Sequence, residues 1–229
     1  VTGGLGVLGN QLIDLLCQDK RNQVFLLDHK KNINRLKRTT FKNKVTFIGG
    51  DFIDLNKIKS LILRHGFKVI FHLGAVTQVI NAYESPMKTF KTNIEGTINV
   101  LEAIRLINKK ILFIYASSDK AYGELVGKSY KENHQLKGIY PYDVSKSASD
   151  LVAQSYSKTY GLKVGIIRCG NIYGPADYNL DRLIPGIIIN TLKNKRIVIR
   201  SSGKLIRDYI YVYDAAKAYI MLMKKMLKN

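Results

Sequence analysis

Tyr142 and Lys146 are the two side chains whose spacing most directly suits acid–base chemistry. They lie four residues apart at the start of an expected helix, so both side chains project from one face. A lysine ammonium beside a phenol favours the phenolate, which lowers the pKa of the phenol and lets tyrosine act as a base. Because this spacing also occurs on ordinary helix surfaces, the pair needs support from other motifs.

A glycine-rich segment at residues 2–9, TGGLGVLG, supplies that support. The spacing of Gly3, Gly6 and Gly9 allows a tight turn whose backbone N–H groups approach a pyrophosphate at the start of a helix. Asp28 ends the next apolar run, where a carboxylate can accept both ribose hydroxyls of an adenosine. Together these features predict an NAD site. NADP is the less favoured alternative, because Asp28 would repel its extra phosphate, while the basic residues 29–31 keep it open.

The elements that position these motifs alternate along the chain. Short β-branched and aromatic runs are separated by longer amphipathic stretches, which predicts an α/β fold with a doubly wound parallel sheet covered on both faces. Strands are expected at residues 24–28, 45–48, 69–73, 111–116, 163–168 and 197–200, and the main helices at 8–18, 86–107, 144–161 and 215–227. Ser118 follows one of these strands, so it lies at the edge of the sheet where the carboxyl ends meet.

Composition narrows the class of protein. Apolar residues make up 46% of the 229 residues, no apolar run is long enough to span a bilayer, and Cys17 and Cys169 lack metal-ligand spacing. We therefore expect a cytoplasmic protein without a disulfide, a metal site or a membrane partner. The net charge of +20 raises the question of nucleic acid, but the densest basic cluster, at 29–44, has only Phe41 among its lysines and arginines. Scattered surface lysine disfavours nucleic acid and suits anionic small molecules.

In this order the motifs resemble the extended short-chain dehydrogenase/reductase family, and within it the NAD-dependent epimerases and dehydratases of nucleotide sugars. The resemblance extends along essentially the whole chain and implies a Rossmann-like fold. Further cofactor-binding residues follow from it in the segments GGDFID (49–54), HLGA (72–75) and SPMKTFKTNIEGTINVLEAIR (85–105): Asp51, Phe52, Leu73, Ala75 and Asn93.

The resemblance also implies a catalytic set of Ser118, Tyr142 and Lys146 that oxidises a sugar hydroxyl, with Lys146 holding the nicotinamide ribose. The segment Ser118-Asp119-Lys120 is similar to the Ser/Thr-Asp-Lys of some 4,6-dehydratases, which implies that Asp119 protonates the departing C6 oxygen and Lys120 abstracts the C5 proton. In the alternative, a 4-epimerase, Asp119 and Lys120 would form only a salt-bridged turn. A non-catalytic NAD-binding scaffold is a third hypothesis.

Substrate contacts are implied by three later segments. RCGNIYGP (168–175) places Asn171 near the diphosphate, and YNLDRLIPG (178–186), with Arg182, is similar to a stretch of CDP-glucose dehydratases. GKLIRDYIYVYDAAKAY (203–219) instead looks like dTDP-glucose dehydratases and many epimerases, with Arg207 clamping the pyrophosphate. These mixed signatures leave the nucleotide base and the sugar open.

The division of the chain follows from the same comparison. Residues 1–170 are expected to form the NAD-binding domain with the catalytic residues, and residues 171–229 part of a nucleotide-sugar lobe. Members of the family begin with a buried strand before the glycine loop, and this strand is largely missing here. We therefore expect a fragment that is poorly stable or inactive in isolation. The resemblance further implies a homodimer through helices at 85–107 and 143–160.

Overall fold

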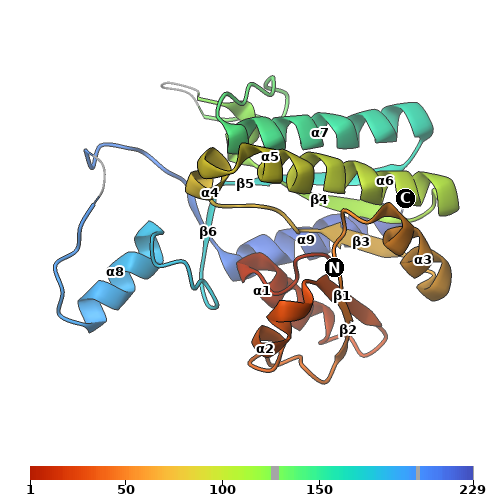
Figure 1. Cartoon of the computed structure of the whole chain (residues 1–229), viewed down its shortest axis with the longest axis horizontal. Helices are drawn as coiled ribbons and strands as arrows, with labels where there is room; N and C mark the ends of the chain where they lie inside the picture. The colour runs from red at the N-terminus through yellow and green to blue at the C-terminus, as the bar shows by residue number, and fades with distance from the viewer. Residues whose placement is uncertain (125–128, 200–201, 229) are drawn as a thin grey trace.

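A parallel sheet forms the centre of the computed structural model, which describes residues 1–124, 129–199 and 202–228 (Figure 1). Its strands are β1 (Val24–Asp28), β2 (Val45–Gly49), β3 (Val69–His72), β4 (Leu112–Ser118) and β5 (Lys163–Cys169). The strand β1 pairs with β2, and β4 pairs with β3 on one side and β5 on the other, always in parallel. These five strands confirm five of the six runs predicted from the sequence.

Val1 and Thr2 occupy the place between β1 and β3. The amide of Thr2 donates to the carbonyl of Phe71 over 3.0 Å, and the amide of Leu27 donates to the carbonyl of Val1 over 2.9 Å. Thr2 thereby bridges both neighbouring strands and gives the doubly wound order β2–β1–Thr2–β3–β4–β5. Behind Val1 the two strands border a cavity of about 390 Å³, whose lining includes Val24, Phe25, Ile62, Val69 and Ile70.

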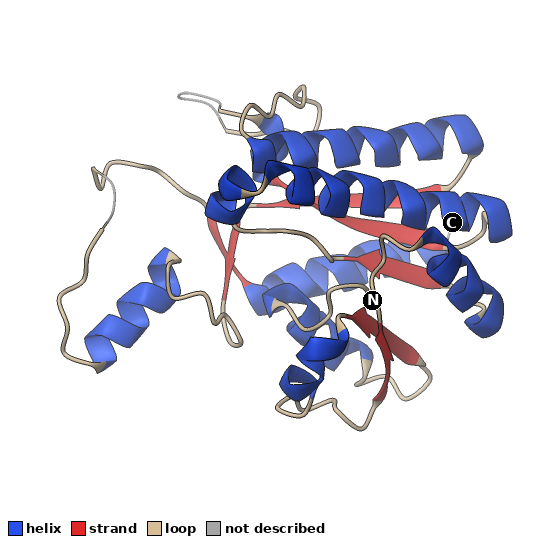
Figure 2. Ribbon diagram, viewed as in Figure 1, coloured by secondary structure: helices blue, strands red, loops and turns tan. Residues whose placement is uncertain are grey.

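Helices cover both faces of the sheet (Figure 2). One face packs against α1 (Val7–Leu16) and α9 (Val212–Lys228). The other packs against α3 (Leu55–His65), α6 (Gly96–Ile107) and α7 (Pro141–Tyr160), with α6 and α7 side by side. The shorter helical segments are η1 (Lys30–Asn32), α2 (Ile33–Leu36), α4 (Val79–Glu84), α5 (Pro86–Phe90), η2 (Lys91–Glu95), which is a π-helical turn, and η3 (Asp119–Tyr122).

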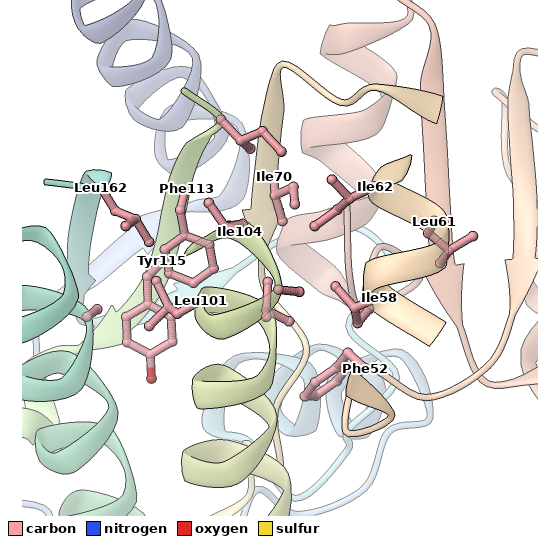
Figure 3. Close-up of a cluster of buried hydrophobic side chains, with 14 of the residues drawn as sticks. Phe52, Ile58, Leu61, Ile62, Ile70, Leu101, Ile104, Phe113, Tyr115 and Leu162 are labelled. Atoms are coloured by element: carbon pink, nitrogen blue, oxygen red, sulfur yellow. The ribbon is translucent and has the colours of Figure 1, made fainter. Parts of the chain in front are cut away.

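Consecutive side chains of β4 enter the two apolar clusters alternately. Phe113 and Tyr115 belong to the cluster under α6 and α7 (Figure 3), whereas Leu112 and Ile114 belong to the cluster under α1 and α9. All four are buried. This alternation is the reason that the strand appears in the sequence as a continuous apolar run.

The C-terminal part of the chain leaves the sheet and then returns to it. The strands β6 (Asn171–Tyr173) and β7 (Tyr209–Tyr211) pair in parallel, α8 (Leu183–Leu192) stands apart in Figure 1, and α9 packs back against β4, β5 and α1. The strand predicted at 197–200 was wrong as far as the structure describes it. Residues 197–199 are exposed coil without a pairing partner, which a β-branched run needs, and Arg200 lies outside the described residues. No helix in the described ranges has the length and apolarity to cross a membrane.

A buried ion pair joins α7 to the carboxyl end of β5. The guanidinium of Arg168 donates two hydrogen bonds of 2.7 and 2.9 Å to the carboxylate of Asp150, whose side chain is fully buried. Arg168 also donates to the phenol oxygen of Tyr122 at the end of η3, and its guanidinium lies 5.0 Å from the centre of that ring. The side chain of Arg168 therefore links α7, β5 and η3.

Arg168→Met should lower the free energy of unfolding by about 3–5 kcal/mol, because the carboxylate of Asp150 would remain buried without a partner. The matched control is Arg105→Met, which breaks the partly exposed pair with Glu102 and should cost about 1 kcal/mol or less. Urea unfolding of both variants measures the difference. Equal losses in the two variants would contradict the anchoring role of Arg168.

Candidate active site

The glycine loop is shaped by close contacts that leave no room for side chains. Gly3 has a φ of +65°, and a Cβ there would lie 2.6 Å from the Cα of Gly74 in the turn after β3. A Cβ on Gly9 would lie 2.5 Å from the Cα of Gly4, so α1 approaches the loop directly. Gly6 precedes the first residue of α1 without a side-chain cap. The first turn of α1 thus has amide groups free to receive an anion.

Asp28 lies at the end of β1, beside this loop. Its carboxylate accepts hydrogen bonds from the amide of Leu5 over 3.3 Å, the amide of His29 over 2.8 Å and the side-chain amide of Asn32 over 2.7 Å. Asn32 was not singled out in the sequence, because its role depends on the turn that follows β1. The geometry brings the predicted carboxylate and glycine loop together.

The two expected cofactor-binding residues after β2, Asp51 and Phe52, lie in different surroundings. Asp51 is half-buried and accepts the amide of Ile53 in a local turn. The ring of Phe52 is buried, since Cβ atoms on Gly74 and Gly96 would each meet it at 2.4 Å, and it packs edge-on to His72. The ring of Phe52 is thus a core side chain (Figure 3), and the expected contact of Phe52 with a cofactor stays a prediction.

Leu73 and Ala75 lie in the loop after β3, where both are half-buried. The amide of Leu73 donates to the carbonyl of Thr2 over 3.2 Å, which extends the pairing of the sheet beyond β3. This loop reaches the glycine turn through the contact between Gly74 and Gly3. The loop therefore lies beside the glycine turn, and the cofactor contacts of Leu73 and Ala75 stay predictions.

Asn93 is the buried centre of a hydrogen-bond network. Its side chain accepts the amide of Val76 over 2.8 Å and donates to the carbonyl of Val76 and to the hydroxyl of Ser145. Ser145 in turn donates to the carbonyl of Tyr142 over 2.7 Å. Both N–H donors of its amide are therefore used, and Asn93 links the loop after β3 to the start of α7.

His72 continues the network to the centre of the sheet. Its Nδ1 lies 2.9 Å from the hydroxyl of Thr2, and its Nε2 lies 3.2 Å from the hydroxyl of Thr97. Thr97 donates its proton to the carbonyl of Asn93, so Nε2 of His72 is the donor to Thr97. Burial, aided by the nearby ammonium of Lys146, lowers the pKa of His72 to about 3 and keeps the ring neutral.

Ser118, Asp119 and Lys120 form the turn between β4 and η3. The hydroxyl of Ser118 donates to the carboxylate of Asp119 over 2.9 Å, and the amide of Lys120 donates to the same carboxylate oxygen over 2.8 Å. Ser118 is buried, whereas Asp119 and Lys120 are half-buried. The structure brings the three residues together at the carboxyl end of the sheet.

Tyr142 faces this turn from the first turn of α7, and its side chain is almost fully buried. Burial raises the pKa of its phenol to about 12; the hydroxyl of Ser118 acts in the opposite direction, and the carboxylates of Asp119 and Asp143 add to the rise. The lowered pKa of this phenol was expected with an oxidised nicotinamide beside it, and it stays a prediction. A positive charge close to the phenol is needed to reverse the shift.

Lys146 is buried one turn further along α7. Its ammonium donates to the carbonyl of Ala116 over 2.8 Å and lies 5.1 Å from the centre of the Tyr115 ring. Burial lowers the pKa of Lys146 to about 8, and Asp150 opposes this shift. The ammonium is thus directed to β4, which explains why it does not lower the pKa of Tyr142.

The predicted substrate residues are placed unequally. Arg182 pairs with Asp177 over 2.7 Å, donates to the carbonyl of Ile172, and lies close enough to Tyr142 to lower the pKa of its phenol slightly. Asn171 is bonded to the backbone of Asp208. Arg207 is exposed, and its guanidinium donates a hydrogen bond to the neighbouring carbonyl of Ile206. The structure brings only Arg182 to the tyrosine.

Asp143 is a residue that sequence reasoning missed. It directly follows Tyr142, is buried, and lies among the charges of Lys120, Asp119 and Glu124. Its place in an expected helix start made it look like an ordinary acidic residue of a first turn. A carboxylate next to the tyrosine was the available signal.

Comparisons with known proteins agree with this geometry. A family model described as the NAD dependent epimerase/dehydratase family matches residues 1–229. The chain belongs to that family. A dTDP-D-glucose 4,6-dehydratase of Dictyostelium discoideum is 31% identical over 98% of this chain, and the chain spans 55% of that relative's length.

Two solved structures, a dehydratase and an epimerase, are similar to this chain. A dTDP-glucose 4,6-dehydratase from Streptomyces venezuelae, with NAD bound, is 27% identical and has a TM-score of 0.88 over 97% of this chain and 70% of its own. A UDP-glucose 4-epimerase from Thermotoga maritima is 26% identical, with a TM-score of 0.85 over 97% of this chain and 72% of its own. The Rossmann-like fold expected from the resemblance is confirmed.

The shifted pKa of Lys146 has a measurable consequence without any ligand. Because the folded chain releases the proton of Lys146 at about pH 8 and an ordinary lysine does so at 10.5, native stability rises with pH between these values. Lys146→Met lacks this gain. Relative to the variant, the free energy of unfolding of the unchanged chain should rise by up to about 3 kcal/mol across the window. Urea unfolding at pH 7.5 to 10.5 measures it, and a constant difference would contradict the shift.

Proposed function

We propose that this chain carries the NAD site and the catalytic residues of a nucleotide-sugar 4,6-dehydratase. The observation that supports this most is the placement of Ser118-Asp119-Lys120 against Tyr142, because a dehydratase needs an acid and a second base beside the tyrosine. The epimerase/dehydratase family supplies the reaction class. The dehydratase relatives support the choice within it.

The residues of the glycine loop fit the cofactor that this function requires. A pyrophosphate would fit against Gly3 and Gly9, which have no side chains, and at the uncapped start of α1 after Gly6. The carboxylate of Asp28 would bind the adenosine ribose. Leu73 and Ala75 would line the site, Asp51 would lie at the adenine end, and Lys146 would hold the nicotinamide ribose. NAD supplies the acceptor and later the donor of the hydride. The carboxylate of Asp28 disfavours NADP.

Each proton transfer has a residue of this chain to perform it. Tyr142, with Ser118 as its hydrogen-bonding partner, takes the proton of the C4 hydroxyl. Lys120, in its neutral form, takes the C5 proton, and Asp119 gives a proton to the C6 oxygen as it leaves as water. The proton held by Lys120 then returns to C5. For Tyr142 to act as a base, the ammonium of Lys146 must turn from the carbonyl of Ala116 toward the phenol.

The substrate is proposed to be a nucleotide-diphosphate hexose. Arg182, placed near Tyr142, would contact it, and Asn171 and Arg207 would bind its diphosphate. Residues 171–229 would thus serve as part of the nucleotide-sugar lobe, with residues 1–170 as the NAD-binding domain. CDP-glucose and dTDP-glucose are both candidate substrates.

One observation favours the alternative of a nucleotide-sugar 4-epimerase. The carboxylate of Asp119 is occupied by the hydroxyl of Ser118 and the amide of Lys120, as in a purely structural turn. The similarity to a UDP-glucose 4-epimerase fits this alternative as well. A non-catalytic scaffold is the weakest hypothesis. Burying Tyr142 and Lys146 costs free energy, and a scaffold would not need these two side chains in its interior.

The homodimer and the cytoplasmic location remain predictions. The outer surfaces of the helices at 85–107 and 143–160 carry the exposed apolar side chains Met87, Leu106 and Leu151. Two such surfaces meeting across a two-fold axis would bury these side chains. Nucleic acid is not proposed as a partner.

The product decides between the two activities. The full-length protein that contains this chain, purified and loaded with NAD, should convert CDP-glucose or dTDP-glucose to a 4-keto-6-deoxy sugar, with solvent deuterium incorporated at C5. A dehydratase must break the C5–H bond, whereas an epimerase need not. NMR of the product measures both features. A 4-epimer without deuterium at C5 would contradict the dehydratase proposal.

Tyr142→Phe should reduce turnover by about 10²–10⁴-fold, because the base at the C4 hydroxyl is lost. The affinity for NAD should stay within about threefold, since the phenol is not part of the glycine loop. A coupled assay and a fluorescence titration with NAD measure the two values. Unchanged turnover would refute the catalytic role. Tyr140→Phe is the matched control, because Tyr140 precedes α7 and is exposed, and it should leave turnover unchanged.

A further inference from the structure

A cavity of about 240 Å³ lies beside the glycine loop, and none of the proposed catalytic residues lines it. One part of its wall comes from Leu5 in the loop and Asn10 in the first turn of α1. Another part comes from Arg35 in α2 and from Arg38 just after that helix. Pockets for drug-sized ligands measure roughly 300–1,000 Å³, so a cavity of this size suits one group of a larger ligand.

Arg35 and Arg38 bring two positive charges to this cavity without a counter-charge. Within the described residues neither guanidinium has an ion pair or a side-chain hydrogen bond. The segment 29–44, to which both arginines belong, contains no Asp or Glu. Of the acids on adjoining elements, Asp14 in α1 accepts a threonine hydroxyl of that segment over 2.7 Å, and Asp28 accepts three hydrogen bonds. A bound anion would therefore supply the missing negative charge.

The type of anion follows from the chemistry of the cavity and from its position. A guanidinium is a planar, permanently charged fork whose N–H groups match the spacing of phosphate oxygens. Leu5 and Asn10 place the cavity against the loop and the helix start that fit a pyrophosphate. Asp28, the expected ribose ligand, does not line the cavity. The cavity thus lies on the phosphate side of the expected cofactor site rather than on its ribose side.

We propose that Arg35 and Arg38 bind the diphosphate group of a nucleotide at this cavity. The cofactor and the nucleotide sugar both carry such a group, so the identity of the nucleotide rests on the proposed function. The wall from the glycine loop favours the cofactor. Tyr178, in the loop after β6, also lines the cavity and belongs to the segment assigned to the substrate. Asn10 and Tyr178 would add neutral N–H and O–H donors beside the two cations.

Equilibrium titration of the full-length protein that contains this chain tests the proposal. Arg35→Gln/Arg38→Gln should raise the Kd for NAD roughly 10-fold, because charge-assisted contacts with phosphate oxygens are lost. The loss should shrink as the salt concentration rises from about 0.05 to 0.5 M. The Kd for adenosine, which has no phosphate, should stay within about twofold, and this result also shows that the variant is folded.

Lys37→Gln is the matched control. Lys37 stands between the two arginines in the sequence and is exposed, but it does not line the cavity. Its replacement removes one positive charge from the same segment and should change the Kd for NAD by less than about twofold. If Lys37→Gln weakens binding as much as Arg35→Gln and Arg38→Gln do singly, only the general charge of the segment matters, and the proposal is overturned.

Titrations with CDP, dTDP and NADP identify the phosphate group. A loss for NAD alone assigns the cavity to the cofactor, and a loss for CDP or dTDP assigns it to the substrate; either result supports a diphosphate site. A loss confined to NADP would overturn the proposal, because NADP differs from NAD only by a phosphate on the ribose. An unchanged Kd for every nucleotide would overturn it as well. Failure of the proposed function would appear separately, as a 4-epimer made by the unchanged protein, and would leave these titrations unaffected.

Discussion

The hydrogen bonds of Asn93 are the constraint on which the site depends. This side chain lies in a π-helical turn, where one extra residue per turn redirects it inward to the loop after β3 and to Ser145 on α7. Through Thr97, His72 and Thr2 the same network reaches the middle of the sheet. In a low-dielectric interior a partly broken network costs more than an apolar core. The same network therefore holds both the loop after β3 and the helix α7 in place, and its loss would displace both.

The charges around α7 are a second constraint on the site, because they set the pKa values of Lys146 and Tyr142. The ammonium of Lys146 is held by a carbonyl and an aromatic ring, with Asp150 one turn away already committed to Arg168. Lys146 thus has no full counter-charge, which is why burial dominates its pKa. Tyr142 has the opposite problem, because two carboxylates and burial disfavour its phenolate. The chain alone therefore keeps Tyr142 as a neutral phenol and brings the pKa of Lys146 down to about 8.

Much of the sheet and part of the site could be predicted from sequence. Apolar runs such as 24–28 and 163–168 have a length and composition typical of covered parallel strands, and the glycine spacing together with Asp28 predicts a dinucleotide site. The prediction at 197–200 failed for residues 197–199, because β-branched residues favour a strand only where a neighbouring strand pairs with them, and the described part of the chain provides none there. Phe52, Asn93 and Asp143 depend on contacts between distant segments, which no local pattern contains.

The helix α7 is inverted relative to an ordinary amphipathic helix. Its buried residues are Tyr142, Asp143, Ser145, Lys146, Ser147, Ser149, Asp150 and Ala153, while Leu151 is half exposed. Such a helix gains little from apolar burial, so its docking relies on polar partners supplied by β4, η2, η3 and β5. The groups that form the site are thus also the groups that hold the helix in place. A substitution on this face of α7 therefore alters both the chemistry of the site and the stability of the fold.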